Sequence, residues 1–172
     1  MASFDIAFAW TMNFEDPKHE YATVPDEPPG AFAIAGVNSA AWPKDFATIN
    51  ALGPDYRPAA VAQFYREEFW NQWLEQIESD EIAKRVFDAG VNMGNGTATT
   101  ILQKAILQCD PDAAFDIDGV FGPHTLMRVN IEPPEKLATA FCAQRVQHYQ
   151  AIVAANPADQ KYLANWLARA QA

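Results

Sequence analysis

Two carboxylates near the start of the chain have the type and setting that cleavage of a glycosidic bond needs. Glu15 follows an apolar run, residues 3–12, whose helical spacing predicts a first helix that ends near Phe14. Asp26 comes later, in a segment rich in proline and closed by Gly30, which cannot continue a helix. An acid at a helix end that faces a carboxylate on a loop suits glycoside hydrolysis: one group protonates the leaving oxygen, and the other acts on water or on the developing charge. The alternative is two solvated surface acids, since the chain has 22 Asp and Glu residues.

The composition indicates a globular protein that does not bind nucleic acid. The 172 residues are 49% hydrophobic and 12% aromatic, which is enough for one domain with a core, or for one domain with a small appended lobe. The formal net charge is −10, whereas nucleic-acid binding usually requires a basic face. Bacterial envelopes are also largely anionic, so contacts within a site would have to provide any binding to a cell wall.

We find no sequence pattern that predicts a metal or another cofactor. Cys109 and Cys142 are not in a metal-binding spacing, and two ordinary thiols are favoured over a bridge between them. The three histidines lie far apart and lack the spacing of zinc ligands. The acids of residues 110–118 suggest a calcium loop, but the ligand spacing and the terminal glutamate of an EF-hand are missing, so turns are favoured there. Phosphate-binding loops and serine nucleophile motifs are missing as well.

Hydrophobic periodicity predicts a mainly α fold with at most a small β-hairpin near residues 32–37. No alternating strand pattern of any length is present. We expect a catalytic lobe over residues 1–79 and a helical lobe over residues 80–172, packed as one compact unit. Asp80 is the expected cap of one helix. The expected helices are 44–52, a long one from residue 59, one over 82–93, 98–108, a short one from residue 124, and two more from residues 134 and 159.

The N-terminal residues do not have the features of a secretory signal, because they lack a basic leader and include Asp5. No stretch has the length of a membrane span. If the protein works outside the cytoplasm, it would be made in the cytoplasm and delivered by something other than a signal peptide. It would then leave by a non-classical route such as a holin-type pore, a phage-like particle or a contractile secretion machine.

Several segments, in order along nearly the whole chain, resemble the glycoside hydrolase family 108 N-acetylmuramidases with their C-terminal peptidoglycan-binding region. Each segment is short, but their common order makes the resemblance specific. The segments are F-E-D-P at 14–17, G-A-F-A-I-A-G-V at 30–37, F-Y-R-E-E-F-W at 64–70, V-F-D-A-G-V-N-M-G-N-G at 86–96, L-Q-K-A-I at 102–106, D-G-V-F-G-P-H-T-L at 118–126, R-V-Q-H-Y at 145–149 and N-W-L-A-R at 165–169.

The resemblance implies a lysozyme-like fold and cleavage of the β-1,4 bond between N-acetylmuramic acid and N-acetylglucosamine. By position, Glu15 would be the general acid, and partial burial beside Phe14 would help it to keep its proton. Asp26 would be the second carboxylate. Peptidoglycan glycan strands are the implied partner, and an inhibitor or immunity protein is a further one. The candidate substrate-binding residues lie in or near the matching segments: Gly36, Tyr65, Trp70 and Asn92.

The sequence departs from the family pattern within the site. Asp16 and Pro17 stand where the family has two glycines, and the loop up to Gly30 is longer, which makes Glu20 a fallback for the acid. The threonine of the family's G-A-T segment is missing, unless Thr23 or Asn38 replaces it.

These departures leave three interpretations open. The protein is an active muramidase, a lytic transglycosylase that acts on the same bond, or a non-catalytic peptidoglycan-binding protein on the same scaffold. A transglycosylase needs one acid and no residue that holds water, so the missing threonine favours it.

Overall fold

The structure, a computed structural model, describes residues 1–113 and 116–172 and divides into two compact units. The first, here called the sheet unit, is Phe4–Asn71, and the second, the helical unit, is Met1–Ser3 with Gln72–Ala172. The sequence-based boundary between residues 79 and 80 therefore lies inside the helical unit. A hydrogen bond from the Ala2 amide to the Glu75 carbonyl (3.0 Å) ties the chain start to the short helix before that boundary.

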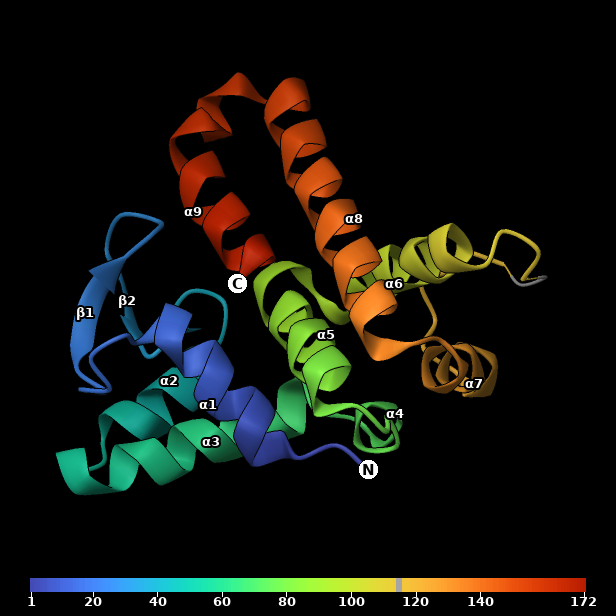
Figure 1. Ribbon diagram of the computed structural model, residues 1–172. Helices are drawn as coiled ribbons and strands as arrows, with labels where there is room; N and C mark the ends of the chain where they lie inside the picture. Colours follow the sequence, from blue (N-terminus) through green and yellow to red (C-terminus); the bar gives the residue numbers. More distant parts are fainter. Residues whose placement is uncertain (114–115) are drawn as a thin grey trace. The chain divides into compact units, whose positions relative to one another are not determined.

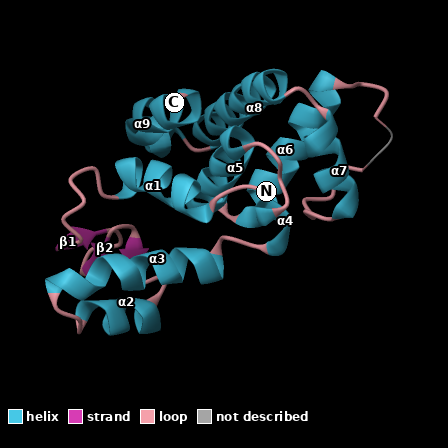
Figure 2. Ribbon diagram, turned by 60° about the horizontal axis from the view of Figure 1, so that its bottom comes forward, coloured by secondary structure: helices cyan, strands magenta, loops and turns pink. Residues whose placement is uncertain are grey.

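The sheet unit contains all the strands of the described residues, and Figure 2 shows them in magenta among helices. Its elements are α1 (Phe4–Glu15), β1 (Thr23–Asp26), β2 (Ala31–Ile34), β3 (Val37–Asn38), α2 (Pro43–Asn50), a 3-10 turn at Pro54–Tyr56 and α3 (Arg57–Glu68).

The three strands form one antiparallel sheet in the order β1-β2-β3, which is larger than the single hairpin expected. Asp26 pairs with Ala31 across the first hairpin, and Ile34 pairs with Val37 across the second. The sequence prediction missed β1 because its T-V-P-D residues are all exposed and include Pro25, so they show no apolar alternation. Proline is tolerated there because β1 is an edge strand.

Aromatic rings pack α1 and α3 together in the sheet unit. Phe8 lies 5.7 Å from Tyr65 between ring centroids, and Phe64 contacts both Tyr65 and Trp42 edge to face. The predicted long helical stripe is broken after Glu68, since Phe69 turns into this same cluster. These ring contacts hold the C-terminal part of α3 in place, where Tyr65 reaches the end of β2.

The helical unit contains six α-helices among the described residues, and α8 and α9 lie side by side in Figure 1 (orange and red). Asp80 does not cap α5 as expected: Ser79 holds the N-cap position, and the Asp80 carboxylate accepts the Ser3 amide instead (2.7 Å). The elements are α4 (Gln72–Glu75), α5 (Asp80–Met93), α6 (Asn95–Cys109), α7 (Pro123–Ile131), α8 (Pro134–Ala155), a 3-10 turn at Pro157–Asp159 and α9 (Gln160–Gln171).

A buried ionic network ties α5, α8 and α9 together. Asp88, with 0% exposure, accepts hydrogen bonds from Arg145 (3.0 Å) and Arg169 (2.7 Å). Arg145 also donates to the Tyr149 hydroxyl (3.2 Å), which in turn donates to the Asn92 side-chain oxygen (2.6 Å). These five residues come from three of the segments that carry the family resemblance, so those segments build the core of the helical unit.

The mainly α class predicted from the sequence is confirmed. Within residues 1–113 and 116–172, no helix combines the length and the apolar character that a bilayer crossing requires. The segment considered as a calcium loop includes residues 114 and 115, which lie outside the described residues.

Candidate active site

Glu15 is the last residue of α1, and its side chain is half-buried. The helix ends there because the Asp16 amide makes the final bond to Met12 (2.9 Å) and Pro17 follows, which has no amide hydrogen to donate. The chain then turns through His19 and Tyr21, both with positive φ. Glu15 therefore projects from a rigid helix end beside an irregular loop, as predicted from the sequence.

The turn between β2 and β3 lies directly against the Glu15 carboxylate. Its two central residues, Ala35 and Gly36, have φ of 45° and 81°, as tight two-residue hairpins require. A Cβ placed on Gly36 would lie 2.7 Å from Glu15 Oε2, and closer still to the Tyr65 hydroxyl oxygen. Only glycine leaves room for the carboxylate at this point.

Tyr65, on α3, is hydrogen-bonded to the same turn. Its side chain is 1% exposed, and its hydroxyl donates a hydrogen bond to the Ala35 carbonyl (2.9 Å). The predicted substrate-binding role of Tyr65 would require an accessible ring. In the structure its hydroxyl instead ties α3 to the turn that contacts Glu15.

Asp26 is held by donors on both of its oxygens. Oδ1 accepts the Glu27 amide (2.8 Å), and Oδ2 accepts the Asn38 side-chain amide (2.7 Å). Asn38 is itself fixed, because its Nδ2 also donates to the Glu27 carbonyl and its Oδ1 accepts the amides of Ala40 and Ala41. The exposed Asp26 carboxylate thus has a defined orientation.

Glu15 and Asp26 line one pocket of about 240 Å³ in the sheet unit. Asp16 and Glu20 line it as well, so four carboxylates share it, and none of its described lining residues is basic. No group of three or more His, Cys, Asp or Glu side chains within the described residues is placed to hold a metal ion. The full lining is Glu15, Asp16, Glu20, Ala22, Val24, Pro25, Asp26, Ala33, Ala35 and Gly36.

Asp16 belongs to the pocket although the sequence gives no signal for it. Its carboxylate accepts the Tyr21 amide (2.7 Å) and so closes the loop that follows α1. Burial raises the pKa of the Tyr21 hydroxyl, and the neighbouring Asp16 charge adds to this. The residue that replaces a family glycine therefore stabilises a loop in which His19 and Tyr21 adopt left-handed conformations.

Thr23, considered as a replacement for the missing threonine, is turned away from the pocket. Its hydroxyl donates to Asn50 Oδ1 (2.8 Å) and accepts from Arg57 (3.3 Å). The side-chain amide of Asn38, the other residue considered, donates a hydrogen bond to Asp26. No serine or threonine is among the described residues that line the pocket.

Besides Tyr65, two more predicted substrate-binding residues are not part of the pocket lining. Trp70 packs edge to face on Phe4, with 5.7 Å between the ring centroids. Asn92 belongs to the helical unit, where its side-chain oxygen accepts the Tyr149 hydroxyl. Of the six candidate residues, Glu15, Asp26 and Gly36 line one pocket. Tyr65 does not line it but is hydrogen-bonded to the turn that contains Gly36.

Two carboxylates that can flank one glycosidic bond are the feature that most glycoside hydrolases share. Residues 18–94 match the family described as Glycosyl hydrolase 108, and residues 97–171 match the one described as Predicted Peptidoglycan domain. The chain therefore combines a glycosyl hydrolase 108 region with a predicted peptidoglycan region, as the sequence segments indicated. Together the two regions support a peptidoglycan hydrolase of the muramidase type. The first match begins after Glu15 and includes Asp26.

The fold is that of a solved structure titled "Structure of Brucella abortus SagA". The TM-score is 0.70 at 21% sequence identity, over 98% of this chain and 89% of that chain. This similarity, together with the helical architecture, confirms the mainly α, lysozyme-like fold. No curated protein matches the sequence significantly.

Proposed function

We propose that the protein is an N-acetylmuramidase that hydrolyses the β-1,4 bond between N-acetylmuramic acid and N-acetylglucosamine, with Glu15 as the general acid. The observation that carries the proposal is that Glu15 and Asp26 line one pocket. The matches to a glycosyl hydrolase family and to a predicted peptidoglycan domain support peptidoglycan as the polymer.

The chemistry assigns different roles to the two carboxyl groups. The Glu15 proton passes to the glycosidic oxygen as the bond from that oxygen to the anomeric carbon breaks, which leaves an oxocarbenium-like centre. Glu15 is half-buried at the end of α1 and lines the pocket, where it would meet the glycosidic oxygen. Water then adds to the anomeric carbon, and its proton passes to a carboxylate.

Asp26 is the group that stabilises the positive centre or accepts the proton of the water. Both of its oxygens face hydrogen-bond donors, Glu27 N and Asn38 Nδ2, which orient an acceptor rather than an acid. Asn38 is therefore a positioning residue for Asp26, as Tyr65 is for the turn against Glu15.

A lytic transglycosylase is the second candidate, and one observation favours it. The described pocket lining has no hydroxyl side chain to hold an attacking water, and Thr23 is occupied by Asn50 and Arg57. In that reaction the sugar's own 6-hydroxyl attacks the anomeric carbon, so the product ends in a 1,6-anhydro ring and no water is consumed.

Mass spectrometry of purified peptidoglycan after incubation with the protein tests these proposals. A muramidase releases fragments with reducing N-acetylmuramic acid ends, and a transglycosylase releases fragments that are lighter by one water. Binding to the wall with no fragments released, by a folded protein, would contradict both and leave a non-catalytic binding protein.

We also propose that the protein acts on the cell wall after leaving the cytoplasm by a holin-type pore, a phage-like particle or a contractile machine. An inhibitor or immunity protein would have to cover the pocket of Glu15 and Asp26. Because four carboxylates line that pocket, such a partner is expected to present a basic side chain to it.

A further inference from the structure

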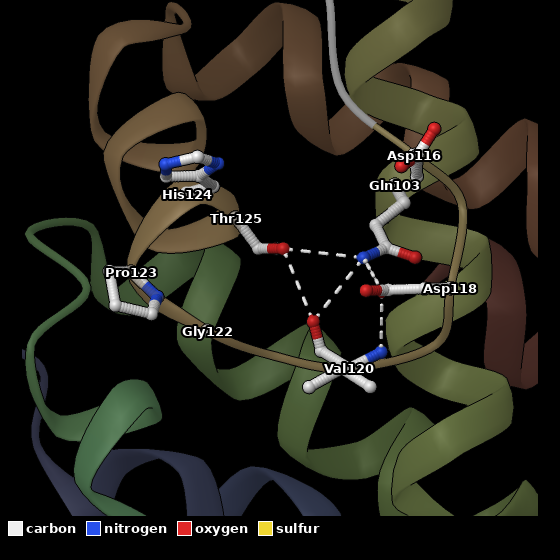
Figure 3. A pocket seen from close by; sticks show the side chains of 8 residues that line it. All are labelled: Gln103, Asp116, Asp118, Val120, Gly122, Pro123, His124 and Thr125. Atoms are coloured by element: carbon white, nitrogen blue, oxygen red, sulfur yellow. Dashed lines mark hydrogen bonds between the residues drawn. The ribbon is translucent and has the colours of Figure 1, made fainter.

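A second pocket, of about 590 Å³, lies in the helical unit between α6, the loop that follows residue 115, and α7 (Figure 3). None of the candidate active-site residues lines it. Its lining residues are Gln103, Asp116, Asp118, Val120, Gly122, Pro123, His124 and Thr125.

The floor of this pocket is polar, buried and already organised. Gln103 is 1% exposed, and its amide nitrogen donates to Asp118 Oδ1 (2.8 Å) and to the Val120 carbonyl (3.3 Å). Its oxygen accepts the Gly119 amide (2.9 Å). Thr125, 3% exposed, closes the network with a bond from its hydroxyl to the Val120 carbonyl. A ligand therefore meets a preformed surface, which lowers the ordering cost of binding.

The charge of the lining favours a cation. Asp116 and Asp118 lie on one side of the pocket in Figure 3, and His124 lies across from them. Hydrogen bonds from the Gln103 side chain and the Val120 amide lower the pKa of Asp118, so its carboxylate is ionised at neutral pH. No lysine, arginine or large aromatic ring is among the described lining residues, so a carboxylate ligand and a stacked sugar ring are both disfavoured.

We propose that this pocket binds a primary ammonium group of peptidoglycan, with Asp116 and Asp118 as its acceptors. The proposal rests on the proposed function, which makes peptidoglycan the target, and the whole pocket lies within the region that matches a predicted peptidoglycan domain. Two parts of the polymer can offer such a group: the side chain of a diamino acid in the stem peptide, and a glucosamine unit that lacks its acetyl group.

Isothermal titration of the full chain tests the proposal, with Glu15→Gln introduced to prevent turnover. The ligands are a soluble stem peptide with a free side-chain amine, the same peptide acetylated on that amine, and oligomers of glucosamine and of N-acetylglucosamine. We expect binding only where a free amine is present, and the pair of ligands that shows it identifies the source. Asp116→Asn should weaken this binding about tenfold, the value of one charge-assisted hydrogen bond.

The matched control is Asp112→Asn, since Asp112 is exposed near the same loop but does not line the pocket. It should leave the affinity unchanged. Equal affinity for free and acetylated ligands, an unchanged affinity in Asp116→Asn, or no binding of any amine would overturn the proposal. Fragment release by the wild-type chain is measured separately, so loss of the proposed hydrolase activity is distinguishable from loss of this site.

Discussion

The carboxylate of Glu15 lies against the backbone of Gly36, so closely that a Cβ at Gly36 would stand 2.7 Å from Oε2. The Tyr65 hydroxyl holds the same turn through the Ala35 carbonyl. The end of α1, the β2–β3 turn and α3 thus meet at one carboxyl group.

Replacing Glu15 by Gln should abolish fragment release while the protein stays folded. The amide keeps the size and polarity of the side chain but cannot give a proton to the leaving oxygen, and general acid help is worth about 10² to 10⁴ in rate. Release of wall fragments and thermal melting are the two measurements. Glu27→Gln is the control, because Glu27 is exposed and does not line the pocket.

Two further variants complete that test. Asp26→Asn should reduce the rate less than Glu15→Gln if Asp26 only stabilises charge, and comparably if it activates the water. Glu20→Gln should retain activity. A well-folded Glu15→Gln protein with the wild-type rate would rule out both enzymatic mechanisms, and an inactive Glu20→Gln would move the acid role to Glu20.

Gly36→Ala should lower activity sharply and destabilise the sheet unit by more than about 1 kcal/mol. The new Cβ would collide with Glu15 and Tyr65, and alanine at φ 81° is strained. Chemical denaturation and fragment release measure the two effects. Gly53→Ala is the matched control in the same unit, because its Cβ would meet only Tyr56, at an ordinary 3.8 Å. Equal effects of the two substitutions would contradict the close contact.

Asn38→Ala should lower kcat with little change in KM, because Asp26 loses the donor on Oδ2 and its defined orientation. Tyr65→Phe should act in the same direction through the turn, at a stability cost of about 1 kcal/mol for the lost hydrogen bond. Steady-state kinetics on soluble glycan fragments separate these effects. A rise in KM alone would instead assign these residues to substrate binding.

Activity on intact walls should rise with added salt before it falls. The net charge is −10, and four carboxylates line the pocket, so an anionic wall and the enzyme repel each other until salt screens them. Turbidity loss of a wall suspension across ionic strengths measures this effect, with an uncharged glycan oligomer as the reference substrate. Activity that only declines with salt would show attraction in place of repulsion.

Asp88→Asn should destabilise the helical unit by about 3–5 kcal/mol, because Arg145 and Arg169 would remain buried without their counter-charge. Urea denaturation measures the loss. Asp5→Asn is the control, since Asp5 pairs with Arg66 at the surface, with side chains 89% and 53% exposed, and such pairs contribute about 0–1 kcal/mol. Similar losses of unfolding free energy in the two variants would contradict a larger contribution of the buried network to stability.

The sequence alone determined most of the helices, their approximate ends and the carboxylate at the end of the first one. The exception is the long stripe from residue 59, which the structure divides into α3 and α4. Apolar spacing and proline or glycine stops are local signals, and burial of one helix face follows directly from them. The ordered segments also identified the glycosyl hydrolase and peptidoglycan regions, which the family matches confirm.

Only the tertiary structure decided which residues surround Glu15 and which lie elsewhere. Gly36, Tyr65 and Asn38 act through contacts between segments distant in sequence, and no local pattern reports such contacts. Asn92 was also a candidate substrate-binding residue from the sequence, but in the structure it accepts a hydrogen bond from Tyr149 in the helical unit. The strand at Thr23–Asp26 is decided in the same way, because an exposed edge strand gains its hydrogen bonds from β2 and not from its own residue pattern.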